Sequence, residues 1–378
     1  MKKNLFLLIL CLLPALLAFA EKAEQAHVFN RANGGFVIVD ENNDIVAFSD
    51  KGTITDLPES AQVFLQSAGL TPHMTNQHAP ATIEALLHAA TTDSVGPLLG
   101  DIAYDQDGPY NGKTPIIAGY HSPTGCVATA MTQIMAYYQH PKECHGAVSY
   151  KTSTLNIPIN ENLEGYKPDW DNILPAYPYG QYSKTQADAI ADLMYAAGVA
   201  IHMDYNRASS GAISDDVGTV MATHFDYDIA IEFVAKADYT DADWHNILQG
   251  ELKAGRVMYY SSQQREGAGH AYVCDGYKVQ EGYEKYPFYH FNWGWSGVAD
   301  GWYRLNKLTA KIEIGGEELE ISQNQRAYIN IRPKDNTPIE LVEVTTSDAP
   351  IYDLFGRQVS ELIPGQIYIQ SNRKFIAQ

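Results

Sequence analysis

The chain has 378 residues, which is long enough for two or three domain-sized units with a real hydrophobic core. Hydrophobic residues make up 45% of the sequence and aromatic residues 11%, so the composition is that of a folded globular protein and excludes a disordered one. The formal net charge of -19 argues against nucleic acid and peripheral membrane binding, because a strongly acidic chain repels phosphate backbones and anionic lipids.

Residues 1–20 have the pattern of a signal peptide. Two lysines precede an apolar run at residues 5–17, and an A-x-A cleavage site ends at Ala20. The alternative, a membrane anchor, needs a longer apolar run, and no second apolar stretch follows. We therefore expect a secreted or cell-surface protein.

A small N-terminal unit is predicted at residues 21–95. Apolar runs at 36–39 and 45–48 flank a polar turn and predict a β-hairpin, and a proline opens a helix predicted over 58–65. A unit of this size without a disulfide needs support from the rest of the chain, so we expect it to pack against the body. We expect proteolytic processing within about residues 88–100, because the stretch 89–94 has the pattern of an exposed connector.

The body, predicted at residues 96–335, places helices before strands. Apolar residues spaced three and four apart predict helices over 126–138, 185–200 and 241–254. Later in the body the pattern changes to that of strands, which we predict at 257–261, 270–275, 286–293 and 301–305. Helices followed by antiparallel strands indicate an α+β fold.

Cys126 begins the first of these helices, directly after Gly125. At a helix N-terminus the dipole and the free N–H groups stabilise a thiolate, so we expect the thiol pKa to lie below the free-cysteine value of about 8.5. His270 follows a glycine-rich loop and opens a strand, where its imidazole could take the thiol proton and later donate it to a leaving amine. A cysteine with a histidine far downstream is the order of papain-type thiol proteases. Taken singly, Cys126 could instead be a structural cysteine at a helix start, and His270 a surface or capping histidine.

Three further residues could support this pair. Gln106 lies upstream of Cys126 and could donate its side-chain N–H to an oxyanion, beside the backbone N–H of Cys126. Asn292 could orient the imidazole of His270 and Trp293 could shield it from water, as an Asn-Trp pair does in papain-type enzymes. The backbone carbonyl of Trp293 is the alternative partner of the imidazole. The plainer interpretations are a surface glutamine and an aromatic core packed against glycines.

Three cysteines follow the predicted signal peptide: Cys126, Cys144 and Cys274. They are too few for a disulfide scaffold, and their odd number leaves at least one thiol unpaired. Cys144 and Cys274 either pair or stay reduced. The His- and Cys-containing segment 140–145 matches no common zinc spacing, so we expect no metal and no cofactor.

Together these motifs resemble the C10 family of cysteine peptidases, which includes the streptopain and interpain types. The resemblance spans most of the body, from about residue 100 to 305, in the family's order. It is carried by Tyr104-Asp105-Gln106 with Gly108-Pro109-Tyr110-Asn111, Thr124 to Ala130, Met203-Asp204-Tyr205 with Ser209-Ser210-Gly211, Gly269-His270-Ala271, and Phe291 to Gly297 with Asp300-Gly301. The N-terminal unit also resembles the family's inhibitory prodomain, through residues 35–39 and 47–52.

The resemblance implies a papain-like fold, with a helical half that carries Cys126 and an antiparallel β half that carries His270. It implies a zymogen whose N-terminal prodomain is an intramolecular inhibitor. The expected activity is endopeptidase cleavage of proteins or peptides through an acyl-enzyme intermediate, with some preference for an apolar side chain at the second position before the cut. The rival functions are a thiol amidase that acts on cell-wall peptides and a non-catalytic surface-binding protein on the same fold.

The tail at residues 338–378 contains short strand-like runs at 351–354 and 367–370 between Gly and Pro turns. It resembles the C-terminal sorting tails of type IX secretion cargo, which implies the secretion machinery as a partner. An ordinary small β appendage is the alternative.

Overall fold

The computed structural model describes most of the body and parts of both ends of the chain. The described residues are 27–31, 34–40, 42–51, 78–263, 269–305, 312–313, 318–319, 323–334, 350–352, 358–359, 367–370 and 373–376. They belong to two compact units, Met1–Pro333 and Lys334–Gln378, which are described separately below. The predicted signal peptide at 1–20 and the predicted helix at 58–65 lie outside the described residues.

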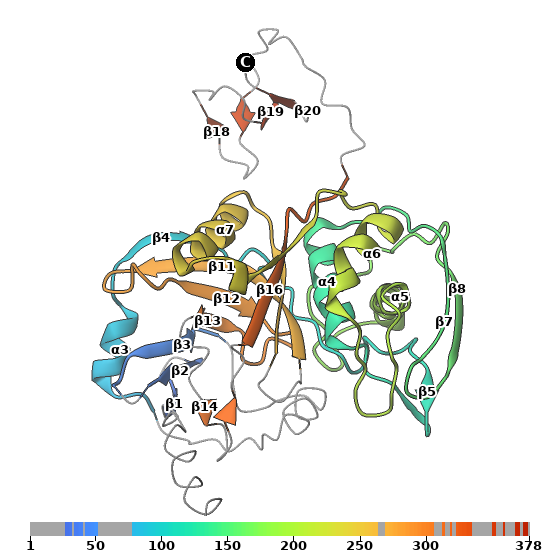
Figure 1. Ribbon diagram of the computed structural model, residues 1–378, viewed down its shortest axis with the longest axis horizontal. Helices are drawn as coiled ribbons and strands as arrows, with labels where there is room; N and C mark the ends of the chain where they lie inside the picture. The colour runs from blue at the N-terminus through green and yellow to red at the C-terminus, as the bar shows by residue number, and fades with distance from the viewer. Residues whose placement is uncertain are drawn as a thin grey trace, which may run out of the picture. The chain divides into compact units, whose positions relative to one another are not determined.

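One antiparallel sheet organises the first unit (Figure 1). Its strands in spatial order are β1 (His27–Asn30), β2 (Phe36–Val39), β3 (Ile45–Ser49), β13 (Gly301–Arg304), β12 (Phe288–Asn292), β11 (Gly269–Gln280), β10 (Met258–Gln263), β16 (Gln323–Ile329) and β9 (Glu232–Ala235). β3 pairs with β13, with Phe48 opposite Trp302. The N-terminal hairpin therefore extends the sheet of the body, which is how a unit too small to stand alone obtains its support.

Helices pack on both sides of this sheet, and Figure 1 shows α4, α5 and α6 gathered in one half of the unit and α7 over the strands of the other half. The α-helices are α3 (Ala81–Leu87), α4 (Cys126–Tyr138), α5 (Lys184–Ala200), α6 (Val217–His224) and α7 (Asp241–Lys253). Two 3-10 turns, η2 (Ser214–Asp216) and η3 (Lys236–Asp238), precede α6 and α7.

The strand pair β10–β11 joins the two halves, because successive side chains on a strand point to opposite faces. One alternate set belongs to the core of α4 and α5: Val257, Tyr259, Ala271 and Val273. The intervening set belongs to the core of α7: Met258, Tyr260, Tyr272 and Cys274. The helical half is thus fixed directly to β11, the strand whose second residue is His270.

The predicted helices agree closely with the observed ones. The helix predicted over 126–138 has those bounds in α4. α5 begins one residue before its predicted start because Ser183 forms a capping box with Gln186, and α7 begins after Thr240, whose side chain accepts from the backbone N–H of Asp243.

The stretch at 89–94 differs from the exposed connector expected there. Thr91–Val95 forms strand β4, which pairs with β11 through contacts such as Val95 opposite Tyr277. Its side chains are mostly exposed, which explains the polar composition, but its backbone is held by the sheet. The polar composition of this segment therefore predicted correctly that its side chains are exposed, but it did not predict that its main chain pairs with β11.

Smaller sheets complete the two units. In the first unit β5 (Ile116–Ile117) pairs with β6 (Tyr120–His121), β7 (Ala147–Lys151) with β8 (Pro158–Asn162), and β14 (Ile312–Glu313) with β15 (Glu318–Leu319). The second unit has a four-stranded sheet in the order β18 (Gln358–Val359), β17 (Ile351–Tyr352), β19 (Ile367–Gln370) and β20 (Arg373–Ile376). The strand predicted at 367–370 coincides with β19.

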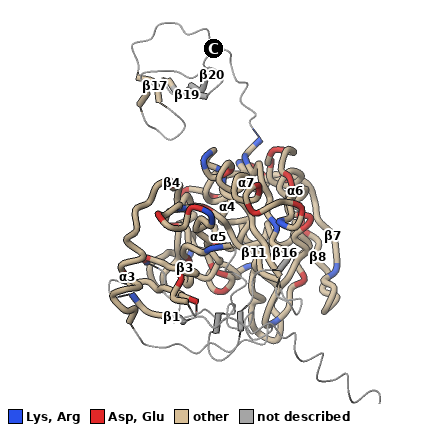
Figure 2. The backbone as a smooth tube through the Cα atoms, turned by 60° about the vertical axis from the view of Figure 1, so that its left-hand side comes forward, with Lys and Arg blue, Asp and Glu red and all other residues tan. Residues whose placement is uncertain are grey.

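Three further properties of the described residues concern their surface charge, the lengths of their helices and their cysteine thiols. Figure 2 shows Asp and Glu residues interspersed with Lys and Arg over the body rather than segregated onto separate elements. Within the described part of the chain, no helix is long and apolar enough to cross a bilayer. Cys144 and Cys274 are buried and free, so the open question of their pairing is answered: both are reduced thiols.

Candidate active site

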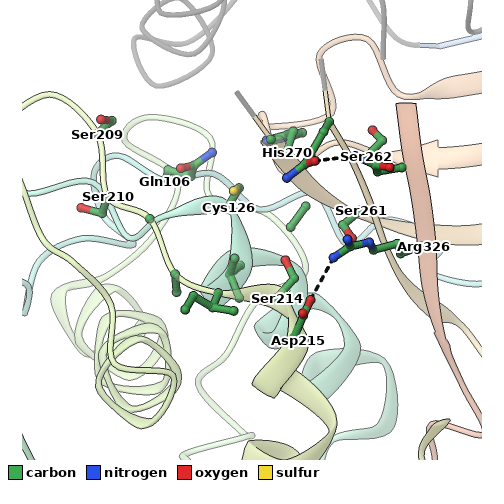
Figure 3. A pocket seen from close by; sticks show the side chains of 18 of the residues that line it. Gln106, Cys126, Ser209, Ser210, Ser214, Asp215, Ser261, Ser262, His270 and Arg326 are labelled. Carbon is green, nitrogen blue, oxygen red and sulfur yellow. Dashed lines mark hydrogen bonds and ion pairs between the residues drawn. The ribbon is translucent and has the colours of Figure 1, made fainter. Parts of the chain in front are cut away.

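A cavity of about 590 Å³ lies where the N-terminus of α4 meets the beginning of β11 (Figure 3). Cys126, His270 and Gln106 all line it. The segment 208–215 forms one wall, and side chains of β10 and β16 form the opposite one. Three residues that the sequence placed far apart are thus brought into one cavity.

Gly125 sets the position of Cys126. Its φ of +86° lies in the left-handed region, and a Cβ there would approach the sulfur of Met203 to 2.6 Å and the carbonyl oxygen of Ser210 to 2.9 Å. Only glycine fits this position without strain. The chain can therefore pass close to Met203 and then enter α4 with the Cys126 side chain directed to the cavity.

The thiol of Cys126 is neutral in this arrangement. The residue is half-buried, but the packing around its sulfur raises the pKa of the thiol, and the backbone N–H groups of Ala271 and Val127 offset only part of this rise. This corrects the expectation of a lowered pKa. Desolvation outweighs the helix N-terminus here, because an enclosed sulfur loses more hydration than a few N–H groups replace.

His270 is held through its backbone-facing nitrogen. Its Nε2 lies 2.9 Å from the carbonyl oxygen of Trp293, so Nε2 carries the proton and donates it. The ring packs against Trp295 at 4.8 Å and is stacked on Tyr272 at 5.9 Å between centroids. Burial lowers the pKa of His270 to about 4, so the imidazole is also neutral at physiological pH.

Asn292 ends β12, and Trp293 begins the loop that follows it. The Nδ2 of Asn292 donates to the carbonyl oxygen of Ile102 at 2.8 Å, and its Oδ1 accepts from the backbone N–H of Gly294 at 3.1 Å. These bonds join the loop to the segment that precedes α4. The carbonyl of Trp293, which the sequence allowed as an alternative, is the group that meets Nε2 of His270. The Trp293 ring is stacked beside His270, with centroids 6.1 Å apart.

Gln106 is buried and tied to the segment that leads into Cys126. Its carbonyl oxygen accepts from the backbone N–H of Thr124 at 2.9 Å, and its own N–H donates to the carboxylate of Asp105 at 2.6 Å. Asp105 in turn accepts from the hydroxyl of Ser296 at 2.5 Å. In Figure 3 the sulfur of Cys126 lies between the Gln106 amide and His270. A group bound at the sulfur would therefore have an amide donor on one side and an imidazole on the other.

Sequence reasoning missed two carboxylate contacts in this region. Asp105 links the loops of Gln106 and Ser296, and its position next to Gln106 was the available signal. Asp215 forms an ion pair with Arg326 of β16 at 3.0 Å on the cavity wall. Arg326 was missed because the apolar pattern did not reveal β16 as a strand.

The segment 140–145 has partners other than a metal. Nε2 of His140 lies 2.9 Å from the carbonyl oxygen of Asp226, and Nε2 of His145 lies 3.2 Å from the Asp226 carboxylate. Among the described residues, no three His, Cys, Asp or Glu side chains gather as a metal site would require.

Comparison with known proteins places this geometry in a family. The model of the peptidase C10 family matches residues 104–303. Streptopain of Streptococcus pyogenes serotype M28 is 31% identical over 333 residues, which cover 81% of this chain and 80% of that protein. The thiol protease/hemagglutinin PrtT of Porphyromonas gingivalis is 26% identical and aligns with 88% of this chain and 39% of its own length.

Solved structures agree with these relatives. A fragment of prointerpain A from Prevotella intermedia superposes with a TM-score of 0.60 at 25% identity, covering 82% of this chain and 96% of that one. Active interpain A superposes with a TM-score of 0.54 at 30% identity, covering 63% and 95%. The chain therefore belongs to the peptidase C10 family and is a cysteine peptidase with a papain-like α+β fold and a large antiparallel sheet.

Proposed function

We propose that Cys126 is the nucleophile of this peptidase and His270 its general base and acid. The observation that carries the proposal is the shared cavity, in which the sulfur faces an imidazole whose Nε2 proton is already committed to the Trp293 carbonyl. That hydrogen bond leaves Nδ1 as the unprotonated nitrogen, which is the form a general base needs.

The reaction follows from these assignments. Nδ1 of His270 takes the thiol proton, and the sulfur of Cys126 attacks the carbonyl carbon of the peptide bond. The oxygen, now negatively charged, receives hydrogen bonds from the Gln106 side chain and the Cys126 backbone N–H. The imidazolium then protonates the leaving amine, and the C–N bond breaks to give an acyl-enzyme. Water, deprotonated by the same imidazole, hydrolyses the thioester and releases the thiol.

We further propose that the described chain is the latent precursor of a secreted or cell-surface enzyme. Two features support latency. The pKa of the Cys126 thiol is raised and that of His270 is lowered, so the pair rests in its neutral form and little of the more reactive thiolate is present. The N-terminal hairpin is paired to β13, within the sheet that carries His270. Export would use the signal peptide at 1–20, with the compact tail unit engaging the secretion machinery.

The test of the nucleophile is the loss of proteolysis. Cys126→Ala and His270→Ala should each abolish casein cleavage and self-processing, because each removes a group that makes or breaks a bond. Cys144→Ala is the matched control, since Cys144 is a free thiol buried in the helical core. Residual activity of Cys126→Ala within tenfold of the unmodified enzyme would refute the assignment. Cleavage of cell-wall peptides with no action on casein would favour the amidase alternative.

A further inference from the structure

The loop from Trp293 to Asp300 returns on itself and closes with a side-chain to main-chain bond. The backbone N–H of Trp293 donates to Oδ1 of Asp300 at 2.9 Å. The carbonyl oxygen of the same Trp293 accepts from Nε2 of His270 at 2.9 Å. A carboxylate that is distant from the sulfur in the sequence is therefore linked to the imidazole through the main chain of one residue.

The residues next to Trp293 also shape the main chain at its carbonyl. Gly294 follows it with a φ of +72°, a conformation that glycine tolerates, and its N–H donates to the side chain of Asn292. The indole of Trp293 packs on Tyr272 with ring centroids 4.4 Å apart. This contact holds the ring, whereas the orientation of the Trp293 peptide groups depends on their hydrogen bonds. Asp300 supplies the bond on the amino side of that residue.

Asp300 lies at a second cavity of about 670 Å³, outside the one that holds Cys126. The other charged and titratable groups that line this cavity come from four parts of the chain. They are Asp50 and Lys51 after β3, Asp101 between β4 and α4, Asp275 and Lys278 on β11, and His290 on β12. The residue keeps some exposed surface, yet the packing around its carboxyl raises the pKa of Asp300 to about 7, against the opposing pull of His290. His290 itself is bound to Asp275, with Nδ1 and Oδ1 2.5 Å apart.

We propose that Asp300 is a positioning residue for the peptidase reaction: it fixes the Trp293 main chain and so holds the carbonyl that sets the orientation and tautomer of His270. This inference rests on the proposed roles of Cys126 and His270. Oδ1 of Asp300 can accept the Trp293 N–H whether the carboxyl group is ionised or neutral, so the acceptor oxygen itself holds the loop in place. Asp300 contacts neither the sulfur nor the substrate in this scheme, and its effect reaches the chemistry only through His270.

The experiment measures kcat and KM separately on processed enzyme. Asp300→Ala and the nearly isosteric Asp300→Leu remove the acceptor, whereas Asp300→Asn keeps an oxygen in its place. Each full-length variant is processed by immobilised unmodified enzyme, and active sites are counted with an epoxide thiol inhibitor. Glu251→Gln is the matched control, because Glu251 is also a buried carboxylate bonded to a backbone N–H, that of Asn330, but it belongs to α7 and lines neither cavity.

The expected result is a fall in kcat per titrated site of about 10²-fold in the Ala and Leu variants, since a displaced base loses its alignment with the thiol. KM should stay within about twofold, because the cleft that binds substrate is unchanged. Asp300→Asn should recover kcat to within about tenfold of the unmodified enzyme, and Glu251→Gln should lower thermal stability without changing kcat.

Two outcomes separate this inference from the function on which it rests. Full kcat in both acceptor-free variants, with Cys126→Ala and His270→Ala inactive, overturns the role of Asp300 alone. Activity in Cys126→Ala overturns the proposed function itself. If Asp300→Ala does not fold, Asp300→Leu decides the matter, and a loss of kcat that Asp300→Asn does not recover would also contradict positioning through an acceptor oxygen.

Discussion

The two halves of the cavity hold their key residues by different means. Cys126 is fixed locally, by a glycine and the first turn of α4, so its position depends on the backbone of adjacent residues. His270 is the second residue of a strand, and its imidazole is held from a loop more than twenty positions away, through the carbonyl of Trp293. The helical half therefore places its residue by chain geometry, and the sheet half by tertiary contacts. Substitutions should expose this difference.

The largest effect is expected at Gly125. In Gly125→Ala a Cβ would meet Met203 and Ser210 in a left-handed backbone, so α4 must shift and the sulfur with it. Casein cleavage should fall at least about 10²-fold, the usual loss for a catalytic group displaced by about 1 Å. Gly180→Ala is the control, since Gly180 has a φ of +76° with no atom within 4 Å of its added Cβ. Equal activity in the two variants would contradict the steric argument.

Gln106→Ala tests the oxyanion donor. Turnover should fall by roughly 10² to 10³, the loss typical of one such hydrogen bond, with the fold intact because the backbone of Gln106 still bonds to Thr124. The measurement is kcat on a peptide substrate, with Gln181→Ala as an exposed glutamine control. An unchanged kcat would return Gln106 to a purely structural role.

The rate of thiol alkylation tests the protonation states of Cys126 in the helical half and His270 in the sheet half, before and after processing. In the intact chain the raised pKa of Cys126 means that thiolate forms only at a pH above the usual range of a cysteine thiol, and the neutral His270, protonated only below about pH 4, cannot stabilise it. Iodoacetamide should therefore react at pH 7 at least roughly tenfold more slowly with the full-length chain than with the processed enzyme. Mass spectrometry confirms that the chain is intact. Equal rates would contradict latency by a neutral pair.

The smallest effect is expected for Asn292→Ala. Its side chain bonds to Ile102 and Gly294, whereas Nε2 of His270 meets a backbone carbonyl, so activity should stay within about tenfold of the unmodified enzyme. A kcat measurement with a circular dichroism check of the fold is sufficient. Complete inactivity of a folded variant would show that the amide acts directly on the imidazole.

Sequence patterns predicted what depends on local spacing. The bounds of α4 and the placement of Cys126 and His270 at element starts followed from apolar periodicity and glycine positions. β4 was missed because its exposed side chains are polar while its backbone is paired, and β16 because its first four residues are Gln, Asn, Gln and Arg. Strand pairing is a long-range property that side-chain composition records poorly.

The contacts that hold the catalytic side chains in place were harder to predict than the identity of those side chains. The partner of His270 is a carbonyl, which every residue possesses, so no residue type marks it. Asp300 is visible in the sequence as an ordinary loop aspartate, and only the closure of the loop gives it a partner. The pKa of Cys126 failed as a prediction for the same reason, because desolvation depends on atoms from several distant segments.

The pairing of β3 with β13 has a cost for the processed molecule. If processing removes the N-terminal hairpin, as proposed above, β13 becomes the border of the sheet, and its main-chain groups that face β3 lose their partners while those that face β12 keep theirs. Phe48, which lies 5.2 Å from Phe288 and 6.5 Å from Trp302 between ring centroids, no longer covers those rings. Lys278, with its ammonium 4.5 Å from the centre of the Trp302 ring, would then be a charged residue beside the unpaired strand edge. Removal of the hairpin would therefore expose a strand edge beside two aromatic rings, and we expect the processed enzyme to self-associate more readily than the precursor.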